Sequence, residues 1–492
     1  MAIRLAERLG VDAGTMSQVY YTCLLFYVGC TANADVAAEI FAGHDALTRY
    51  GGPVRFGARA QRAAGLMRAV APPTGTPLLR ARQLAVGLPR LVRLFPVQVA
   101  ALCEVAQMLT DRLGLPTEIG ELFAYNDERW DGRGDPGRAG GDEIPLAVRI
   151  VQVARDATFQ RMLGGSERAV RIIRGRAGRA FDPAIARQLA GSAEALLEAG
   201  PERDTWNETL ACEPEPHVML AGDAIDRALA AIGDFADLAS PFLVGHSAGV
   251  AWLAAGAGAS LGLDSAETTA IRRAALVHDV GRVAVPVKTW QKPGPLSTDE
   301  WESVRLHAYH TERVLMRSPF LAAVAPIATF HHERLDGSGY HRGVAGAGIG
   351  RPARLLAVAD AYHAMTEPRP HRPAWSPADA AASLADAVRS GRLDAEAASA
   401  VIEAAGQPIP RLERPAGLTD REAQVLVLLA RGHATKEVAA ALGISVKTAD
   451  RHVQNAYAKI GVSSRAAAAL FAMEHGLVTW GELPISGADV RR

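Results

Sequence analysis

Residues 8–29 and 260–281 share one pattern of apolar and polar positions and align without a gap. Both patterns predict a helix. Near its end, each helix carries two apolar residues, a variable pair and then Val-Gly. The pair is Phe26-Tyr27 in the earlier stretch and His278-Asp279 in the later one. In the later stretch Asp264 and Glu267 can form a capping box, and Gly281 suits a helix stop.

The match between the two parts of the chain returns three more times in the same order. The further pairs are residues 127–136 with 332–341, 149–157 with 354–362 and, more weakly, 181–189 with 393–401. Four matched segments in one order indicate an internal duplication, which decides how the fold is interpreted. The segment that corresponds to His246 would precede Met1, which gives the hypothesis that the sequence begins inside the first helix of the earlier copy.

The two copies differ at positions that could bind a metal. In the later copy these positions are His278, Asp279, His331, His332 and Asp360, and in the earlier copy they are Phe26, Tyr27, Asn126, Asp127 and Arg155. Arg155 would place a cation where a metal ion would sit. Glycines and apolar positions, which serve the backbone and the core, are kept. The earlier copy is therefore interpreted as a domain that retained its fold and lost its metal site.

The later copy offers a set of metal ligands spread over more than a hundred residues. The candidates are His246, His278, Asp279, His307, His331, His332 and Asp360. One histidine on an apolar helix is more often a core residue, but seven candidate ligands at five spaced sites favour a metal centre. Imidazole with carboxylate suits Mn, Fe or Zn better than Mg or Ca. Two ions roughly 3.5–4 Å apart can activate a water molecule and hold both oxygens of an in-line phosphoryl displacement.

The helical pattern changes after a Pro- and Gly-rich linker at residues 406–417. It predicts a helix beginning at Thr419 or Asp420, a short helix over 435–442, and a third helix capped by Ser445. The predicted inward stripe of the third helix is Val446, Ala449, Val453, Ala456 and Ile460. A short helix, a tight glycine turn and a helix with polar and basic residues match a helix-turn-helix DNA reader. Charge alone would favour the alternative, a helical bundle that binds another protein.

Composition limits the remaining possibilities. At 492 residues the chain suggests about three domains. Its formal net charge is zero, so a claim of nucleic-acid or membrane binding has to rest on a local element. The four cysteines are scattered, which fits a reducing cytosol, and no apolar run is long enough to span a bilayer. We expect a cytoplasmic protein.

The stretches "HDVGR", "HHERLDGSGY" and "LLAVADAYHAMTEPRPHR" resemble the HD-GYP branch of the HD phosphohydrolase superfamily. The resemblance implies an all-α fold, a centre of two or three metal ions, commonly iron or manganese, and hydrolysis of cyclic di-GMP. It covers residues 235–405 strongly. It covers residues 1–200 weakly, which implies a degenerate HD-like domain without metal ligands.

The resemblance also implies roles for individual residues. The seven candidates above would bind the metal ions, and Asp279 would bridge them. The implied catalytic residues are His278, Asp279 and Arg282, and the implied substrate-binding residues are Arg282, Tyr340, Arg369 and Arg372. Arg282 stands where the family usually has a lysine that touches the scissile phosphate, so the charge is kept and the shape is not.

The sequence departs from the family pattern at three places. Phe242 stands where three-metal members have a glutamate, so two divalent transition-metal ions, Mn or Fe, are expected. His341 replaces the proline of the Gly-Tyr-Pro signature, and it does not restrict the loop as proline would. Gly249 replaces an arginine common after the first histidine. The remaining histidines of this region are expected to be bystanders, namely His310, His341, His363 and His371.

Residues 418–480 resemble the LuxR-type helix-turn-helix over nearly their whole length, including "LTDRE", "KEVA", "LGIS" and "YAKIGVSSR". The resemblance implies binding of double-stranded DNA, typically as a dimer that meets through the fourth helix, about residues 464–475. The expected DNA contacts are Lys447, Thr448, Arg451, His452 and Lys459, with Arg465 in support. Asp450 is interpreted as lying off the interface.

These inferences combine into one prediction with two alternatives. The predicted protein is an all-α homodimer with two tandem HD-type domains, the first degenerate and paired with the second as a scaffold, and a four-helix LuxR-type domain. It would regulate transcription and hydrolyse or sense a cyclic dinucleotide such as cyclic di-GMP. The alternatives are a non-catalytic, ligand-sensing transcription factor and a phosphohydrolase acting on another phosphate ester.

Overall fold

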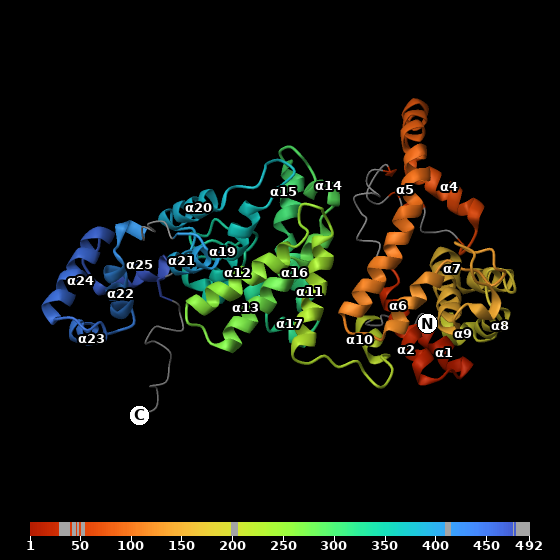
Figure 1. The fold of residues 1–492 in the computed structure, drawn as a ribbon, viewed down its shortest axis with the longest axis horizontal. Helices are drawn as coiled ribbons and strands as arrows, with labels where there is room; N and C mark the ends of the chain where they lie inside the picture. Colours follow the sequence, from red (N-terminus) through yellow and green to blue (C-terminus); the bar gives the residue numbers. More distant parts are fainter. Residues whose placement is uncertain are drawn as a thin grey trace. The chain divides into compact units, whose positions relative to one another are not determined.

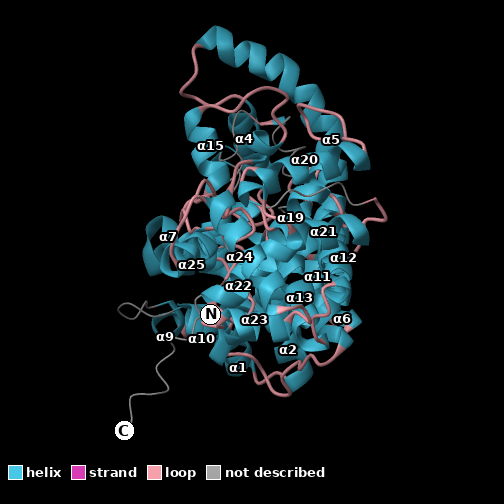
Figure 2. Cartoon of the chain, turned by 90° about the vertical axis from the view of Figure 1, so that its left-hand side faces the viewer, coloured by secondary structure: helices cyan, strands magenta, loops and turns pink. Residues whose placement is uncertain are grey.

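The computed structural model describes residues 1–28, 40–41, 46, 49–50, 55–197, 205–408, 415–475 and 477–478. The chain divides into two units, Met1–Ala231 and Ile232–Arg492, with the division inside helix α11 (Asp223–Asp237). Over the described ranges the backbone forms helices and loops, with only isolated bridges and no sheet (Figure 2). The predicted all-α fold is confirmed. None of the described helices is long and apolar enough to cross a membrane.

The first unit is built around α7 (Figure 1), in which Gly164 and Gly165 leave the helical conformation and separate two helical segments. Its helices are α1 (Ala2–Leu9), α2 (Ala13–Leu25), α4 (Arg59–Val70), α5 (Pro77–Arg112), α6 (Thr117–Leu122), α7 (Leu146–Arg174), α8 (Pro183–Gly191), α9 (Ala193–Leu197) and α10 (Thr205–Ala211). Helices α1, α2 and α8 pack against α7. Residues such as Ile150 and Val153 of α7 are fully buried there and form the core.

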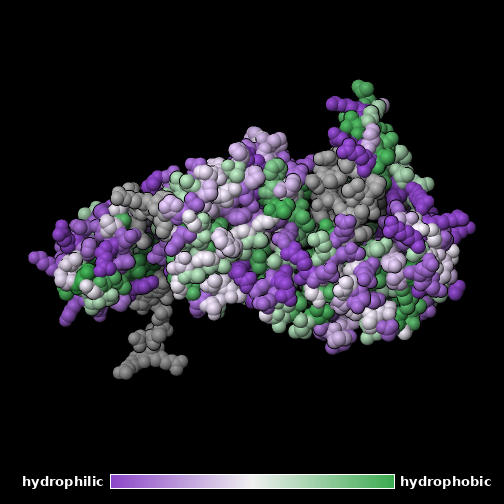
Figure 3. All heavy atoms as spheres, in the orientation of Figure 1, coloured by the Kyte–Doolittle hydropathy of each residue, from purple (hydrophilic) through white to green (hydrophobic). Residues whose placement is uncertain are grey.

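Helix α5 of the first unit carries hydrophobic side chains on its surface. Leu78, Val86 and Val92 are all more than half exposed. Figure 3 shows hydrophobic and hydrophilic side chains mixed over the part of the surface that α5 forms. The arginines that alternate with the hydrophobic residues explain why this long helix is not apolar enough to be a membrane span.

The second unit begins with a helical domain centred on α19. Its helices are α12 (His246–Ser260), α13 (Ser265–Val277), the 3₁₀ helix η5 (Val280–Ala284), α14 (Val287–Trp290), α15 (Thr298–Arg305), α16 (His307–Leu315), α17 (Pro319–Ala322), α18 (Ala325–Ala328), the 3₁₀ helix η6 (Gly346–Gly348), α19 (Arg351–Thr366), α20 (Pro377–Arg389) and α21 (Ala395–Ala404). Helix α12 packs against α13, α19 and α21. Residues 355–360 of α19 are buried without interruption, so α19 forms the centre of the domain.

Equivalent side chains make equivalent contacts in the two units, as a duplication requires. Asp12 caps α2 and Asp264 caps α13, each by accepting a backbone N–H of the first turn. The predicted capping box of Asp264 and Glu267 is confirmed. A buried ion pair also recurs at matched positions: Arg149–Asp182 at 2.8 Å in the first unit and Arg354–Asp394 at 3.3 Å in the second.

A glycine loop is also repeated. A side chain at Gly134 would collide with the Cα of Glu128, and one at Gly339 would collide with the Cα of Glu333. Both glutamates are buried and accept backbone N–H groups of the loop that follows. The glycines are therefore kept in both copies because the backbone passes too closely for any side chain.

The sequence pattern predicted that Gly281 ends a helix, and this prediction was wrong. Helix α13 ends at Val277, and Gly281 lies inside η5. A Cβ atom at Gly281 would collide with the carbonyl oxygen of His307 and the backbone nitrogen of Thr311. Its role is to let η5 pack directly against the backbone of α16, which brings Asp279 to His307.

The C-terminal part of the second unit has the predicted four helices. They are α22 (Asp420–Ala430), α23 (Thr435–Ala441), α24 (Val446–Ile460) and α25 (Arg465–Glu474). Thr419 and Ser445 cap α22 and α24. Within the predicted inward stripe, Ala449 and Ala456 are fully buried, but Val446 is 50% exposed, so its placement in the core was wrong.

Candidate metal centre

The structure brings the seven predicted ligands of the second unit together around Asp279. They come from the start of α12, the end of α13, the start of α16, the end of α18 and the middle of α19. The Oδ1 atom of Asp279 lies 3.2 Å from Nε2 of His307 and 3.4 Å from Nε2 of His331. Its Oδ2 atom lies 2.9 Å from Nε2 of His278 and 3.5 Å from Nε2 of His246.

Asp360 closes the other side of the cluster. Its Oδ1 atom lies 3.1 Å from Nε2 of His246, and its Oδ2 atom lies 3.7 Å from Nδ1 of His332. The side chains thus form two groups that share one carboxylate, namely Asp279 with His307, His331 and His332, and Asp279 with His246, His278 and Asp360. A carboxylate shared between two ligand groups can bridge two cations.

Three of the imidazoles are held so that their Nε2 atoms face the cluster. Nδ1 of His278 lies 2.6 Å from the carbonyl oxygen of Ala275, and Nδ1 of His331 lies 2.6 Å from that of Ala328. Nδ1 of His307 contacts the carbonyl oxygen of Val304 in the same way. A backbone acceptor at Nδ1 fixes the proton there and leaves a lone pair on Nε2, which is the arrangement that metal ligands need.

The buried polar atoms of the cluster test whether it fits a metal ion. Both carboxylate oxygens of Asp279 and Nε2 of His278 are buried and make no hydrogen bond of regular geometry, although Asp279 contacts Arg282 and lies 2.9 Å from His278. Buried polar atoms without well-formed hydrogen bonds are costly. A cation that prefers mixed nitrogen and oxygen ligands would satisfy all of them, and such cations include Mn, Fe and Zn. The residues present therefore fit a transition-metal centre.

The charges of the cluster are strongly coupled. Burial would raise the pKa of Asp279, but Arg282 and His278 hold it well below its usual range. Burial would lower the pKa of His278, but the carboxylates of Asp279 and Asp360 raise it to about 10. Burial lowers the pKa of His331 to about 4. Without a metal, His278 therefore carries a second proton, on Nε2, at neutral pH, and this proton must leave before Nε2 can bind a metal ion.

Metal binding is expected to release about one proton per chain near pH 8, because His278 must lose its proton to become a ligand. The apparent metal affinity should rise about tenfold per pH unit as the pH increases towards 10. Calorimetric titration with Mn²⁺ in two buffers of different ionisation enthalpy measures the proton count. Equal heats in the two buffers would contradict this assignment of the proton.

Glu367 and His363 adjoin the cluster and were not predicted as site residues. The Oε2 atom of Glu367 lies 2.8 Å from Nδ1 of His246, and its Oε1 atom lies 3.3 Å from Nδ1 of His363. Arg369 donates to the same carboxylate at 2.8 Å. Glu367 thus accepts from Nδ1 of His246, as backbone carbonyls accept from Nδ1 of His278, His307 and His331. His363 is not the bystander that the sequence suggested.

Gly249 explains how His363 reaches this position. A Cβ atom at Gly249 would overlap the imidazole ring of His363. The ring therefore occupies the space that any side chain at residue 249 would need. The departure from the family pattern at Gly249 and the presence of His363 are two parts of one packing arrangement.

Replacing Glu367 by glutamine should weaken metal binding about 10- to 100-fold, because the partner of His246 loses its charge. The matched control is Glu403→Gln on the exposed face of α21, which should bind metal like the unchanged chain. Calorimetric titration of the metal-free variants with Mn²⁺ gives both affinities. Equal affinities for Glu367→Gln and its control would show that Glu367 does not orient His246.

Arg282 is buried against the cluster and faces two carboxylates. Its guanidinium contacts Asp279 and lies 3.9 Å from Oδ1 of Asp237, with the ring of Trp290 beside it. Asp237 is buried and accepts hydrogen bonds from the backbone and hydroxyl of Ser247, and burial raises its pKa. The sequence did not point to Asp237, because it lies outside the matched segments.

The other predicted substrate-binding residues lie in different surroundings. Tyr340 packs its ring 4.3 Å from that of His332, beside the cluster. Arg369 donates to Glu367 and to the carbonyl oxygen of Phe242. Arg372 donates to backbone carbonyls, including those of Ala364 and Met365. The guanidinium groups of both arginines thus fix the segment after α19.

The loop that carries the altered signature has an unusual backbone. His341 has a φ of 35°, in the left-handed region that favours glycine and that proline cannot adopt. The N–H of Arg342 donates to the carbonyl oxygen of Tyr340 across this residue. The backbone at His341 therefore has a conformation that the proline of the family signature could not adopt. Of the other expected bystanders, His310 is half-buried and His371 is exposed.

The side chains of α24 divide into those that face solvent and those that pair within the domain. Lys447, Thr448 and Arg451 are exposed, and His452 is partly buried. Lys459 pairs within the domain: its Nζ donates to Glu422 at 2.7 Å and to the carbonyl oxygen of Gly417. Arg465 donates to the carbonyl oxygen of Leu429. Figure 3 shows hydrophilic side chains over much of this end of the second unit.

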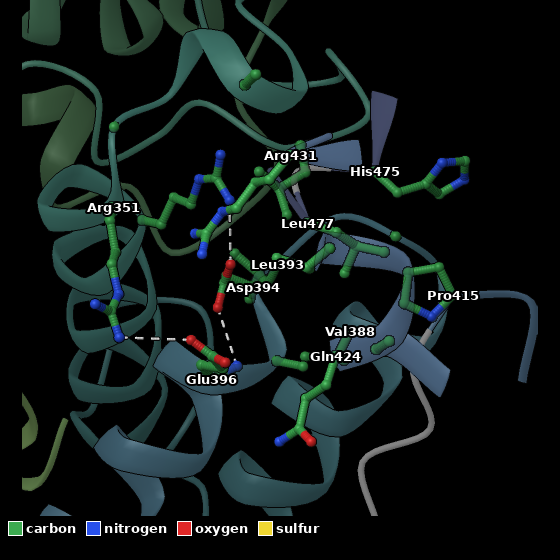
Figure 4. A pocket seen from close by; sticks show the side chains of 18 of the residues that line it. Arg351, Val388, Leu393, Asp394, Glu396, Pro415, Gln424, Arg431, His475 and Leu477 are labelled. Carbon is green, nitrogen blue, oxygen red and sulfur yellow. Dashed lines mark hydrogen bonds and ion pairs between the residues drawn. The ribbon is translucent and has the colours of Figure 1, made fainter. Parts of the chain in front are cut away.

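A pocket of about 700 Å³ lies between the α19–α21 region and the C-terminal helices (Figure 4). Arg351 pairs with Glu396 across its wall, and Asp394, which caps α21, pairs with Arg354. Gln424 of α22 and Arg431, directly after that helix, also line the pocket. Helix α19 thus begins at this pocket and carries Asp360 into the metal cluster further along.

The comparisons with known proteins agree with this architecture. The chain belongs to the HD domain family, whose model matches residues 97–185 and 231–397, more than half of its length. The model for bacterial regulatory proteins of the luxR family matches residues 416–472. The protein is therefore an HD-domain protein with a C-terminal LuxR-type domain, as the motifs indicated.

Curated relatives and one solved structure resemble parts of the chain. The 3'3'-cGAMP-specific phosphodiesterase 3 of Vibrio cholerae serotype O1 is 33% identical over 56% of this chain and 61% of that protein. The cyclic di-GMP phosphodiesterase response regulator RpfG of Xanthomonas campestris pv. campestris is 38% identical over 30% of this chain and 39% of that protein. The chain thus covers less than two thirds of either relative. The crystal structure of the cyclic GMP-AMP specific phosphodiesterase V-cGAP3 of V. cholerae matches with a TM-score of 0.52 and 23% identity, covering 82% of this chain and 90% of that one, which shows a shared fold.

Proposed function

We propose that the second unit is a phosphodiesterase that hydrolyses a cyclic dinucleotide and that its LuxR-type domain binds double-stranded DNA. The observation that supports this most is the single carboxylate, Asp279, shared by two buried ligand groups. Relatives that match this region are named as phosphodiesterases for 3'3'-cGAMP and for cyclic di-GMP. The protein would regulate transcription in the cytoplasm according to the concentration of its substrate.

The chain's own residues would divide the work of hydrolysis. The two ligand groups would hold two divalent transition-metal ions, Mn or Fe. When bound, such ions lower the pKa of a water molecule and stabilise charge on the phosphate. Arg282, buried beside Asp279, would neutralise the scissile phosphate, and Tyr340 would pack against a base or ribose next to His332.

Hydrolysis by the full chain tests the proposal. The protein, prepared with Mn²⁺ or Fe²⁺, is offered cyclic di-GMP, 3'3'-cGAMP and a generic phosphodiester, and the products are separated by chromatography. Turnover of a cyclic dinucleotide that is lost in Asp279→Ala supports a phosphodiesterase. Turnover of the generic diester alone would favour a phosphohydrolase acting on another phosphate ester.

A ligand sensor without catalysis is the second candidate function. The left-handed backbone at His341, where the family signature has proline, favours it because it adjoins Tyr340, the proposed contact for a base or ribose. Tight binding of a cyclic dinucleotide without turnover in the same assay would support the sensor. In that case the metal centre would hold the ligand, and its occupancy would be signalled to the LuxR-type domain.

The proposed DNA interface is the exposed start of α24. Lys447, Thr448 and Arg451 would contact DNA, with His452 at the edge. Lys459 and Arg465 would stabilise the domain, since both donate to groups inside it. Leu470 on α25 is 64% exposed, so α25 offers an apolar contact for a homodimer. Light scattering of the chain and of Leu470→Glu tests the dimer, which the variant should lose.

A further inference from the structure

A cavity of about 450 Å³ lies in the first unit, at the position that the metal centre occupies in the second. Phe26 and Tyr27 at the end of α2 line it, where the second unit has His278 and Asp279 after α13. Arg155 of α7 also lines it, where the second unit has Asp360 on α19. The site lost its metal ligands, but an open volume of ligand size remains.

The walls of this cavity are mainly apolar. The apolar lining includes Tyr20, Leu24, Val151, Ala154, Phe159 and Met162. Tyr27 is 50% exposed and Met162 is 74% exposed, so the cavity opens to the surface. An apolar cavity that solvent can reach suits a ligand with a hydrophobic body.

Arg155 places a positive charge in the cavity, whose lining also includes the charged side chains of Arg4 and Glu208. The guanidinium carbon of Arg155 lies 4.4 Å from the ring centroid of Phe26, 5.9 Å from that of Tyr27 and 5.8 Å from that of Phe56. Among the described residues, no carboxylate forms an ion pair with Arg155. Stacking on rings uses the face of a guanidinium, and the N–H groups around its edge can then bind a planar anion through two hydrogen bonds.

The charge at this position has the opposite sign in the two units. Asp360 in the second unit suits a cation, and Arg155 in the first unit suits an anion. We propose that the first unit binds an organic carboxylate with an apolar body, whose carboxylate pairs with Arg155 and whose body fills the cavity. This site is independent of the proposed phosphodiesterase, because its residues belong to the first unit alone.

Dodecanoate serves as the probe, titrated calorimetrically into the full chain below its micelle concentration. One saturable site per chain is expected, and Arg155→Met should weaken binding about tenfold or more, since it removes the charge and keeps the stem. The matched control is Arg171→Met, an exposed arginine on the same helix, which should bind like the unchanged chain. Dodecanol, which has the same body without the charge, should bind at least about tenfold more weakly than dodecanoate. Equal affinities of Arg155→Met and Arg171→Met for dodecanoate would overturn the proposal.

Cysteine alkylation tests the same site in the unchanged chain, should Arg155→Met fail to fold. Cys23 and Cys212 both line the cavity and are free thiols. Dodecanoate should slow their reaction with iodoacetamide, measured peptide by peptide by mass spectrometry, and dodecanol at the same concentration should slow it much less. Unchanged alkylation of both thiols at saturating dodecanoate would overturn the proposal.

Discussion

Asp279→Asn should remove both halves of the metal centre at once. Asp279 belongs to both ligand groups, with one oxygen facing His307 and His331 and the other facing His278 and His246. Asparagine keeps the shape of the side chain, but its amide cannot bridge two cations and one of its two ends is a donor. We expect the metal content, measured by mass spectrometry of the elements, to fall from about two ions per chain to below about 0.2.

The same variant should lose turnover by roughly 1,000-fold or more, because the metal ions supply both the nucleophile and the charge stabilisation. His332→Gln is the matched comparison, since His332 belongs to only one of the two groups. It should retain about one ion per chain. If Asp279→Asn retained as much metal as His332→Gln, the shared carboxylate would not be the bridge.

Gly281→Ala should unfold or rearrange the region between η5 and α16. The added Cβ would overlap two backbone atoms of α16, the carbonyl oxygen of His307 and the nitrogen of Thr311, and neither can rotate away. Overpacking against a rigid backbone destabilises, and we expect a loss of about 2–4 kcal/mol in the free energy of unfolding. His307 would also move away from Asp279, so metal affinity should fall together with stability.

Gly294→Ala is the control for this prediction, because nothing lies within 4 Å of a Cβ atom there. Chemical denaturation of the metal-free chain gives the two stabilities, and Mn²⁺ titration gives the affinities. If Gly281→Ala were as stable as Gly294→Ala, the close packing of η5 on α16 would be refuted as the reason for this glycine.

The sequence predicted the metal cluster because His278, Asp279, His332 and Asp360 lie in segments that the duplication made visible, and the family resemblance added His246 and His307. Positions such as Asp360 and Arg155 could be paired by alignment, and the contrast between them identified the changed chemistry. Glu367 was not predicted, although it lies in a quoted motif. Its contact with His246 depends on how the chain turns after α19, held by Arg372 on backbone carbonyls, and residue spacing does not encode that turn.

The interpretation of glycines shows the same limit. Gly281 was interpreted as a helix stop and Gly339 as part of the family signature. The structure shows that each must be glycine because the backbone of another segment passes too close for a side chain. Val446 was assigned to the core because it fits the helical period of α24, yet as the first residue of that helix it is half exposed. Hydrophobic periodicity predicts which face of a helix is buried. It does not predict whether the neighbouring helices reach far enough to cover the first residue.

The cavity in the first unit could not be predicted from the repeat. Helix α10 contributes part of its wall through Thr205 and Thr209, and this helix lies after the last matched segment. Alignment therefore identified Phe26, Tyr27 and Arg155 as replacements of metal ligands. It gave no sign that a segment outside the repeat forms a wall beside them and leaves a volume open.

Diffraction from crystals grown with Mn²⁺, measured at the manganese absorption edge, tests the central claim most directly. We predict two anomalous peaks roughly 3.5–4 Å apart on either side of Asp279, and none beside Phe26, Tyr27 and Arg155. The absence of any peak at Asp279 in crystals that contain manganese, or a peak in the first unit at Arg155, would contradict the account.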